Sequence, residues 1–224
     1  SFLRAGLLPR LRREDRRFVV CDIVRPERNA LIGESGLAQA IVGTRRAFGM
    51  SVPSLGDVKA ACLSADVERI AGWFEDVRDR AAQQLLDRDE DGDPTESSVA
   101  PTLVLPLDQA EELFSADAGE NAEIFLKLLA AVTARCNQGG VGLLVAATVR
   151  TDRYEVMQTH PALAGMPAVL FDELKPMPPT QFKEVIVGPA ERASESAAPL
   201  RVSPDLVDRL LADAGQGADT LPIL

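Results

Sequence analysis

Residues 102–108, TLVLPLD, decide the fold class when they are set beside VGLLVAATVR at 141–150. Both are compact apolar runs that lead into polar residues, and a third run, RFVVCDIV at 17–24, is rich in β-branched residues. Continuous apolar runs of this kind are typical of parallel strands that are buried on both faces. We predict that residues 17–24, 102–107 and 141–149 are parallel neighbours in one sheet, with Asp108 and Arg150 at the same edge.

Segments with helical spacing separate these strands. In the stretch 65–86, one apolar stripe comprises Val67, Ile70, Phe74, Val77, Ala81 and Leu85. Further helices are expected over 2–12, from near Gly33 to Phe48, and from about residue 120 to Gly139. The alternation of strands and helices predicts an α/β fold with a largely parallel sheet.

The sequence pattern changes near Lys175, where a Pro-rich linker leads into segments that are expected to form short helices. In the last of these, Ser203 is expected as the N-cap and Pro204 at the first helical position, with an inward face of Leu206, Val207, Leu210 and Leu211. We therefore predict a core over 1–175 and the start of a helical lid over 176–224. The acidic segment 87–98 is predicted to be a loop.

Composition limits the function classes. The chain has 224 residues, a formal net charge of -10 and an isoelectric point of about 4.7. An acidic balance argues against a general nucleic-acid surface, since phosphate binding needs basic residues. No apolar run is long enough to span a bilayer, so no membrane role is expected. Three widely spaced cysteines form no metal or disulfide pattern, which favours reduced, buried thiols and a cytoplasmic location.

Asp108 is the first candidate for chemistry. An acid at the end of a parallel strand lies at the sheet edge where ligands bind in open α/β folds. In P-loop NTPases an Asp at this place holds Mg²⁺. The alternative is that Asp108 and Glu111 cap the following helix, where acids complement the positive end of the dipole.

Thr148 and Arg150 follow the next strand. A guanidinium at the same edge can reach a terminal phosphate. The alternative is that Arg150 pairs with Asp152 or with the acidic segment 109–112. The chain contains no G-x-x-x-x-G-K-[ST] motif, but its opening, SFLRAGLLPRL, has the character of the helix that follows such a phosphate loop.

In chain order, SFLRAGLLPRL, RPERNALIGESGL, LVLPLDQAEELF, ATVRTDRYEVMQTHPAL, FKEVIVGPAERA and LLADAGQGADTLPIL resemble the novel STAND NTPase family. These are bacterial multidomain signalling ATPases related to the apoptotic and NLR-type ATPases. The resemblance spans nearly the whole chain, and it implies an ASCE-type P-loop NTPase sheet flanked by helices, followed by the start of a helical lid.

The resemblance also implies roles for single residues. Ser1 falls on the Mg²⁺-binding hydroxyl of the phosphate loop or on the residue after it, and Asp108 falls on the Walker B Asp. Gln109 stands where many relatives carry a second acid, so Glu111 and Glu112 become candidates for the water-polarising base. Arg150, with Thr148 beside it, matches the sensor Arg of a T-x-R motif. Leu221 and Pro222 resemble the lid motif whose Pro packs against adenine.

The function implied by this resemblance is an ATP- and Mg²⁺-binding regulatory switch, an ATPase in its full-length protein, which controls oligomerisation and an attached effector. The expected partners are nucleotide, other domains of the parent chain and further copies of it. The alternative is a non-catalytic interaction scaffold that keeps the fold, and Gln109 favours it.

Three other features are expected to be structural. DRDEDG at 87–92 matches only half of a calcium loop, because Ser98 replaces the final Glu. His160 has no second His and no nucleophile elbow, and is expected in a turn. Trp73 is expected to pack in the core.

Overall fold

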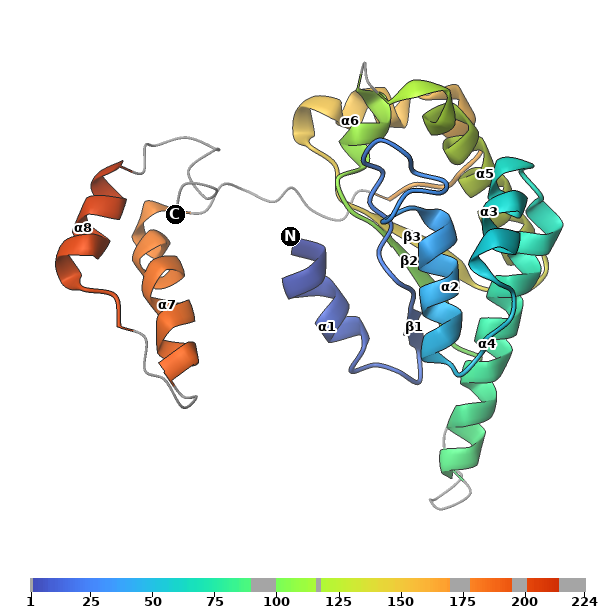
Figure 1. The fold of residues 1–224 in the computed structure, drawn as a ribbon, viewed down its shortest axis with the longest axis horizontal. Helices are drawn as coiled ribbons and strands as arrows, with labels where there is room; N and C mark the ends of the chain where they lie inside the picture. The colour runs from blue at the N-terminus through green and yellow to red at the C-terminus, as the bar shows by residue number, and fades with distance from the viewer. Residues whose placement is uncertain (1, 90–99, 116–117, 170–177, 195–200, 214–224) are drawn as a thin grey trace. The chain divides into compact units, whose positions relative to one another are not determined.

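The computed structural model describes residues 2–89, 100–115, 118–169, 178–194 and 201–213. Along the chain the elements are η1 (Leu3–Leu7), α1 (Leu8–Leu11), β1 (Phe18–Val20), α2 (Leu37–Ala47), α3 (Leu55–Leu63), α4 (Val67–Asp89), β2 (Thr102–Leu107), η2 (Ala110–Phe114), α5 (Gly119–Gln138), β3 (Leu143–Ala147), α6 (Thr151–Gln158), η3 (Pro161–Leu163), η4 (Pro179–Gln181), α7 (Phe182–Ser194) and α8 (Pro204–Asp213). They form two compact units, 1–168 and 169–224 (Figure 1). The predicted boundary at 175/176 lies outside the described residues.

The first unit is built on a three-stranded parallel sheet in the order β1-β2-β3. Val19 pairs with Leu103, and Leu103 pairs with Leu143. This confirms the predicted parallel neighbours, although β1 covers only three residues of the stretch 17–24. An isolated parallel bridge between Val24 and Leu107 extends the contact of the first two strands.

Helices cover the sheet and complete an α/β fold of the expected class. The helix α1 packs against β1, α4 contacts β2, and α5 contacts β3. The helix α5 buries one apolar face, made of Ala122, Phe125, Leu128, Leu129 and Val132. Trp73 is 8% exposed and belongs to the same core, as expected.

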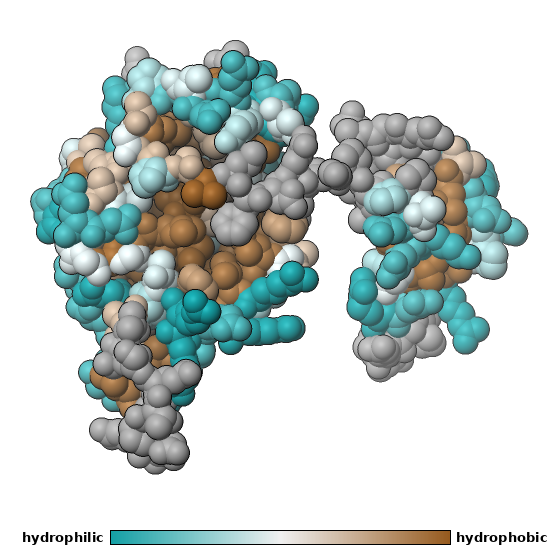
Figure 2. All heavy atoms as spheres, turned by 180° about the vertical axis from the view of Figure 1, so that it is seen from behind, coloured by the Kyte–Doolittle hydropathy of each residue, from teal (hydrophilic) through white to brown (hydrophobic). Residues whose placement is uncertain are grey.

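The outer edge of β3 is less covered. Within the described residues, β3 pairs only with β2, so no strand lies beside its other edge. Leu144, the second residue of β3, is 49% exposed on a face of the sheet. The side-chain amide of Asn137 bonds both backbone groups of Leu143, at 3.0 Å and 3.1 Å, and so occupies the start of this edge. Figure 2 shows hydrophobic residues gathered in the middle of one face of the same unit.

Two helix boundaries differ from the prediction. The helix expected from near Gly33 begins at Leu37, because residues 25–36 form a compact loop closed by a hydrogen bond from the Arg25 N–H to the Ser35 carbonyl (2.8 Å). The loop expected over 87–98 does not start at residue 87, because α4 continues to Asp89. The rest of that acidic segment, including residues 90–92 of the half-matched calcium loop, lies outside the described residues.

The helix α3 was not predicted. Its start is defined by a capping box, in which the Ser54 hydroxyl accepts from the Asp57 N–H and the Asp57 carboxylate accepts from the Ser54 N–H. This reciprocal pair satisfies two donors that a helix start otherwise leaves open.

The second unit consists of α7 and α8, which contact each other. Ser203 caps α8 as predicted, since its hydroxyl accepts from the Leu206 N–H at 3.3 Å. The expected inward face is wrong at one position: Val207 is 3% exposed, but Leu206 is 49% exposed. Leu206 lies on the first turn, beside the cap, where the helix points it outward.

Candidate functional site

Three strand ends lie side by side at the carboxyl edge of the sheet. The Asp108 N–H donates to the Val24 carbonyl (2.9 Å), and the Thr148 N–H donates to the Leu107 carbonyl (2.9 Å). Asp108 and Thr148 are therefore neighbours just beyond the ends of β2 and β3, and Arg25 lies beside them because it follows Val24, which bridges to Leu107 beyond the end of β1. This is the edge at which ligands bind in open α/β sheets.

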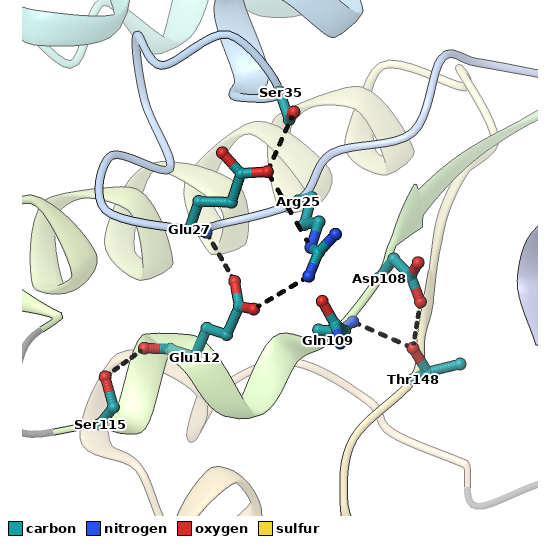
Figure 3. Close-up of polar contacts among 8 residues, drawn as sticks. All are labelled: Arg25, Glu27, Ser35, Asp108, Gln109, Glu112, Ser115 and Thr148. Carbon is teal, nitrogen blue, oxygen red and sulfur yellow. Dashed lines mark hydrogen bonds and ion pairs between the residues drawn. The ribbon is translucent and has the colours of Figure 1, made fainter. Parts of the chain in front are cut away.

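Asp108 and Thr148 are joined directly (Figure 3). The Thr148 hydroxyl donates to the Asp108 carboxylate at 2.9 Å and accepts from the Gln109 N–H at 3.1 Å. Asp108 is 5% exposed. One oxygen of a nearly buried carboxylate is thus held in place, which orients the group at the sheet edge.

Gln109 has an unusual conformation for a residue with a side chain. Its φ is 56° and its ψ is 49°, in the left-handed region. Its side-chain oxygen Oε1 is buried and has no hydrogen-bond partner among the described residues. A buried acceptor without a partner costs about 1–3 kcal/mol, and strained backbone of this kind clusters at functional sites.

A second polar cluster joins the loop 25–36 to η2. The Glu27 N–H donates to Glu112 Oε2 at 2.7 Å, and a guanidinium nitrogen of Arg25 lies 3.6 Å from Glu112 Oε1. The Ser35 hydroxyl donates to Glu27 Oε1 at 3.4 Å. Both carboxylate oxygens of Glu112 thus face the loop rather than Asp108.

Sequence reasoning missed Arg25 and Glu27. Arg25 directly follows the stretch predicted as the first strand, so the rule that selected Asp108 and Arg150 would also have selected it. Glu27 gave no local signal, because its contact with Glu112 joins residues 85 positions apart.

The other predicted site residues lie as follows. Arg150 precedes α6 at the end of the third strand; its side chain is 68% exposed, and Nε lies 3.0 Å from Asp152 Oδ1. Asp152 is one of the two partners considered for Arg150 from sequence. Glu111 is half-buried on η2. Ser1 and Pro222 lie outside the described residues.

His160 follows α6 in a turn, as expected. Its Nδ1 accepts from the Ala162 N–H at 3.3 Å, and its Nε2 lies 3.3 Å from Glu123 Oε2. These contacts are structural ones between α5 and the turn that starts η3. The described residues contain no helix that is both long and apolar enough to cross a membrane.

Asp108 fits a magnesium ion. No group of three or more His, Cys, Asp or Glu side chains among the described residues could hold a metal. Mg²⁺ does not need one, because it is commonly bound by one or two carboxylates together with waters and substrate phosphates. A single oriented carboxylate at the ligand edge of the sheet meets that requirement.

The parallel sheet, its helices and an acid at the ligand edge define an α/β fold of the P-loop NTPase kind. Comparison with known families makes this specific: the model of the family Novel STAND NTPase 1 matches residues 1–224. The chain belongs to that family of nucleotide-binding signalling modules. Comparisons with curated proteins and with solved structures gave no match.

Proposed function

We propose that this chain is the nucleotide-sensing part of a bacterial signalling protein, a switch that binds ATP with Mg²⁺ and controls oligomerisation and an attached effector. The observation that carries the proposal is the Asp108–Thr148 hydrogen bond at the carboxyl edge of the sheet, in a chain of the STAND NTPase family.

The proposed roles follow from charge and position. Asp108 holds Mg²⁺, which when bound screens the negative charge of the phosphates. Thr148 orients Asp108, and Arg150 contacts the terminal phosphate, for which its exposed guanidinium has to leave Asp152. Ser1 and Pro222 serve the phosphate and adenine ends of the nucleotide. A ligand shifts an equilibrium only by its differential affinity for two states, so Arg150 is the residue that separates ATP from ADP.

Nucleotide titration of the full-length protein tests the proposal. Mg-ATP binding, followed by calorimetry, is expected to be lost or weakened roughly tenfold to a hundredfold in Asp108→Ala, because a charged ligand is removed. Residues 1–224 alone are expected to bind ATP very weakly, because most phosphate contacts of such proteins come from a Gly-rich loop and its Lys, and this chain has no such motif. Micromolar binding by residues 1–224 would contradict that account of the phosphate site.

The second candidate is a scaffold that keeps the fold without turnover. Gln109 favours it, since an amide cannot accept a proton as a carboxylate can. A G-x-x-x-x-G-K-[ST] motif in the sequence upstream would support the switch, and its absence there would support the scaffold. Full-length protein that assembles equally well with and without ATP would also support the scaffold.

A further inference from the structure

A group of exposed arginines surrounds the turn that precedes the first strand. Residues 10–17, RLRREDRR, contain five arginines and two acids and therefore have a net charge of +3, in a chain whose net charge is -10. All five arginines are exposed. We call residues 10–17 the basic turn. Such a local reversal of charge attracts partners of the opposite charge, so the basic turn is a candidate interaction surface.

The basic turn lies at the end of the strands that is opposite the candidate nucleotide site. The Arg17 N–H donates to the Glu14 carbonyl at 2.9 Å, which closes a tight turn between α1 and β1 (Figure 1). The Thr102 N–H donates to the Arg17 carbonyl at 2.8 Å, which places Arg17 at the amino ends of β1 and β2. Asp108 follows the carboxyl end of β2. A partner on the basic turn therefore leaves the carboxyl edge of the sheet open.

A cavity of about 180 Å³ opens beside the basic turn. Its lining includes both apolar and charged side chains: Phe18, Phe48, Leu85, Arg12 and Arg88. The size suits one large apolar side chain. Interfaces between proteins commonly combine an apolar anchor residue in a pocket with a polar, charged rim. The cavity therefore adds an apolar contact to the positive charge of the basic turn.

The charged groups lie at the rim of this cavity. Arg88 pairs with Asp15 at 2.8 Å, and both side chains are more than half exposed. The guanidinium of Arg17 lies 5.8 Å from the ring centre of Phe18, which lines the cavity. Because Asp15 is paired with an arginine from outside the turn, the five arginines of the basic turn keep a positive excess beside an apolar hole.

We propose that the basic turn binds an acidic segment of a separate partner protein, and that an apolar side chain of this segment enters the cavity. Guanidinium groups pair with carboxylates through two parallel hydrogen bonds, which suits an acidic peptide. The apolar cavity favours a protein partner, because a phosphate backbone offers no side chain to fill it. Glu14 and Asp15 within the turn, and the net charge of -10, repel an extended polyanion such as DNA or an anionic membrane. A short segment touches only the basic turn.

The test measures the binding of two labelled peptides to the full-length protein by fluorescence anisotropy. The probe is a short peptide of Glu residues around one central Phe, and the control peptide carries Ser in place of that Phe. The Phe peptide is expected to bind roughly tenfold more tightly, because only its ring fills the cavity. Its affinity should also fall as salt is added, since exposed charges are screened.

Two double variants assign the binding to the basic turn. Arg12→Gln combined with Arg17→Gln removes two positive charges beside the cavity and is expected to weaken the Phe peptide roughly threefold to tenfold. Arg192→Gln combined with Arg209→Gln removes two exposed arginines of the second unit and should leave the affinity unchanged. All four side chains are exposed, so thermal melts of both variants should match that of wild type.

Equal affinities for the two peptides would overturn the role of the cavity, and equal losses in the two double variants would overturn the role of the basic turn. Duplex DNA or phosphatidylserine vesicles that bind more tightly than the Phe peptide would assign the basic turn to a nucleic acid or a membrane and would overturn the proposal. Self-association of the full-length protein that only the Arg12 and Arg17 variant abolishes would assign it to a second copy, which also contradicts a separate partner.

Discussion

Thr148 uses one hydroxyl for two hydrogen bonds at the centre of the candidate site. It donates to the carboxylate of Asp108 and accepts from the N–H of Gln109, which joins the ends of β2 and β3. Position 148 needs a side chain that can both donate and accept a hydrogen bond. A methyl group in place of the hydroxyl would leave a nearly buried carboxylate and a backbone N–H without these partners.

Thr148→Val should therefore destabilise the protein by about 1–3 kcal/mol, the usual effect of leaving buried polar groups unpaired. Thr148→Ser keeps the hydroxyl and should lose much less. Urea denaturation of the two variants beside wild type measures the difference. Equal stability of the Val and Ser variants would mean that the hydroxyl does not hold Asp108 in solution.

The substitution Arg150→Ala distinguishes two interpretations of Arg150, a contact with the terminal phosphate of ATP and a purely structural pair with Asp152. If it contacts the terminal phosphate, Arg150→Ala in the full-length protein should weaken ATP roughly tenfold to a hundredfold and leave ADP nearly unchanged. The variant should also uncouple ATP from effector activation. Parallel ATP and ADP titrations, with a thermal melt alongside, make the measurement.

The ion pair between Arg150 and Asp152 provides a control for the Arg150→Ala experiment. Its pair with Asp152 is solvent-exposed on both sides, 68% and 58%, and such pairs contribute little to stability. Asp152→Ala should therefore leave the melting temperature and the ADP affinity unchanged. Equal losses of ATP and ADP in Arg150→Ala would contradict the sensor role.

At the scale of the elements, the loop 25–36 is folded so tightly that its backbone leaves no room for a side chain at its glycines. A Cβ on Gly33 would stand 2.5 Å from the Asn29 carbonyl oxygen, a backbone atom that cannot move without opening the turn. Two residues of the same loop, Ala30 and Leu31, are buried. The loop is therefore a packed element, and it holds Arg25 and Glu27 against Glu112.

Gly33→Ala should destabilise the protein by about 1–3 kcal/mol, since forcing backbone apart has effects of this size. Gly72 offers a matched control, because it lies inside α4 with open space around a built Cβ. Gly72→Ala should stabilise by about 0.5–1 kcal/mol through helix propensity. Thermal melts of both variants test the contrast, and a stabilised Gly33→Ala would contradict the packed loop.

The elements that sequence predicted best are those with long apolar patterns. The strand β2 was expected over 102–107 and lies at Thr102–Leu107, and α5 was expected from about residue 120 and begins at Gly119. The helix α3 was missed because its nine residues are too few for a clear stripe. The start of α2 was misplaced because the loop before it is closed by backbone contacts that no spacing encodes.

For the candidate site, the sequence predicted which residues follow the strands. It did not predict the contacts that the side chains of the site make with one another. The rule that polar residues follow buried parallel strands located Asp108, Thr148 and Arg150. It could not foresee that the Glu112 carboxylate faces Glu27, because that contact depends on how two distant loops close.

At the scale of the whole molecule, the core contains three free thiols, all buried. Burial raises the pKa of Cys21 and of Cys62 to about 12 and that of Cys136 to about 11. A thiol whose folded-state pKa is raised favours the folded state at pH values below its ordinary pKa, and this contribution is lost as pH rises above it.

Stability should consequently fall above about pH 9, because unfolded thiols ionise there and folded ones do not. Urea denaturation at pH 8 and pH 10 measures this, and a variant with all three cysteines changed to Ala should show a smaller decline. Ellman's reagent should react with the thiols only on unfolding. Rapid labelling of the native protein at pH 8 would contradict their burial.

The outer edge of β3 has a consequence for the exchange of amide hydrogens with deuterated water. Parallel pairing directs the N–H groups of Leu144 and Ala146 toward β2 and those of Val145 and Ala147 toward the outer edge, while Asn137 holds the N–H of Leu143. Slow and fast exchange should therefore alternate along a single strand, with Val145 and Ala147 exchanging first. Exchange measured residue by residue by NMR would show the alternation, and uniform protection would mean that the outer edge is paired in solution.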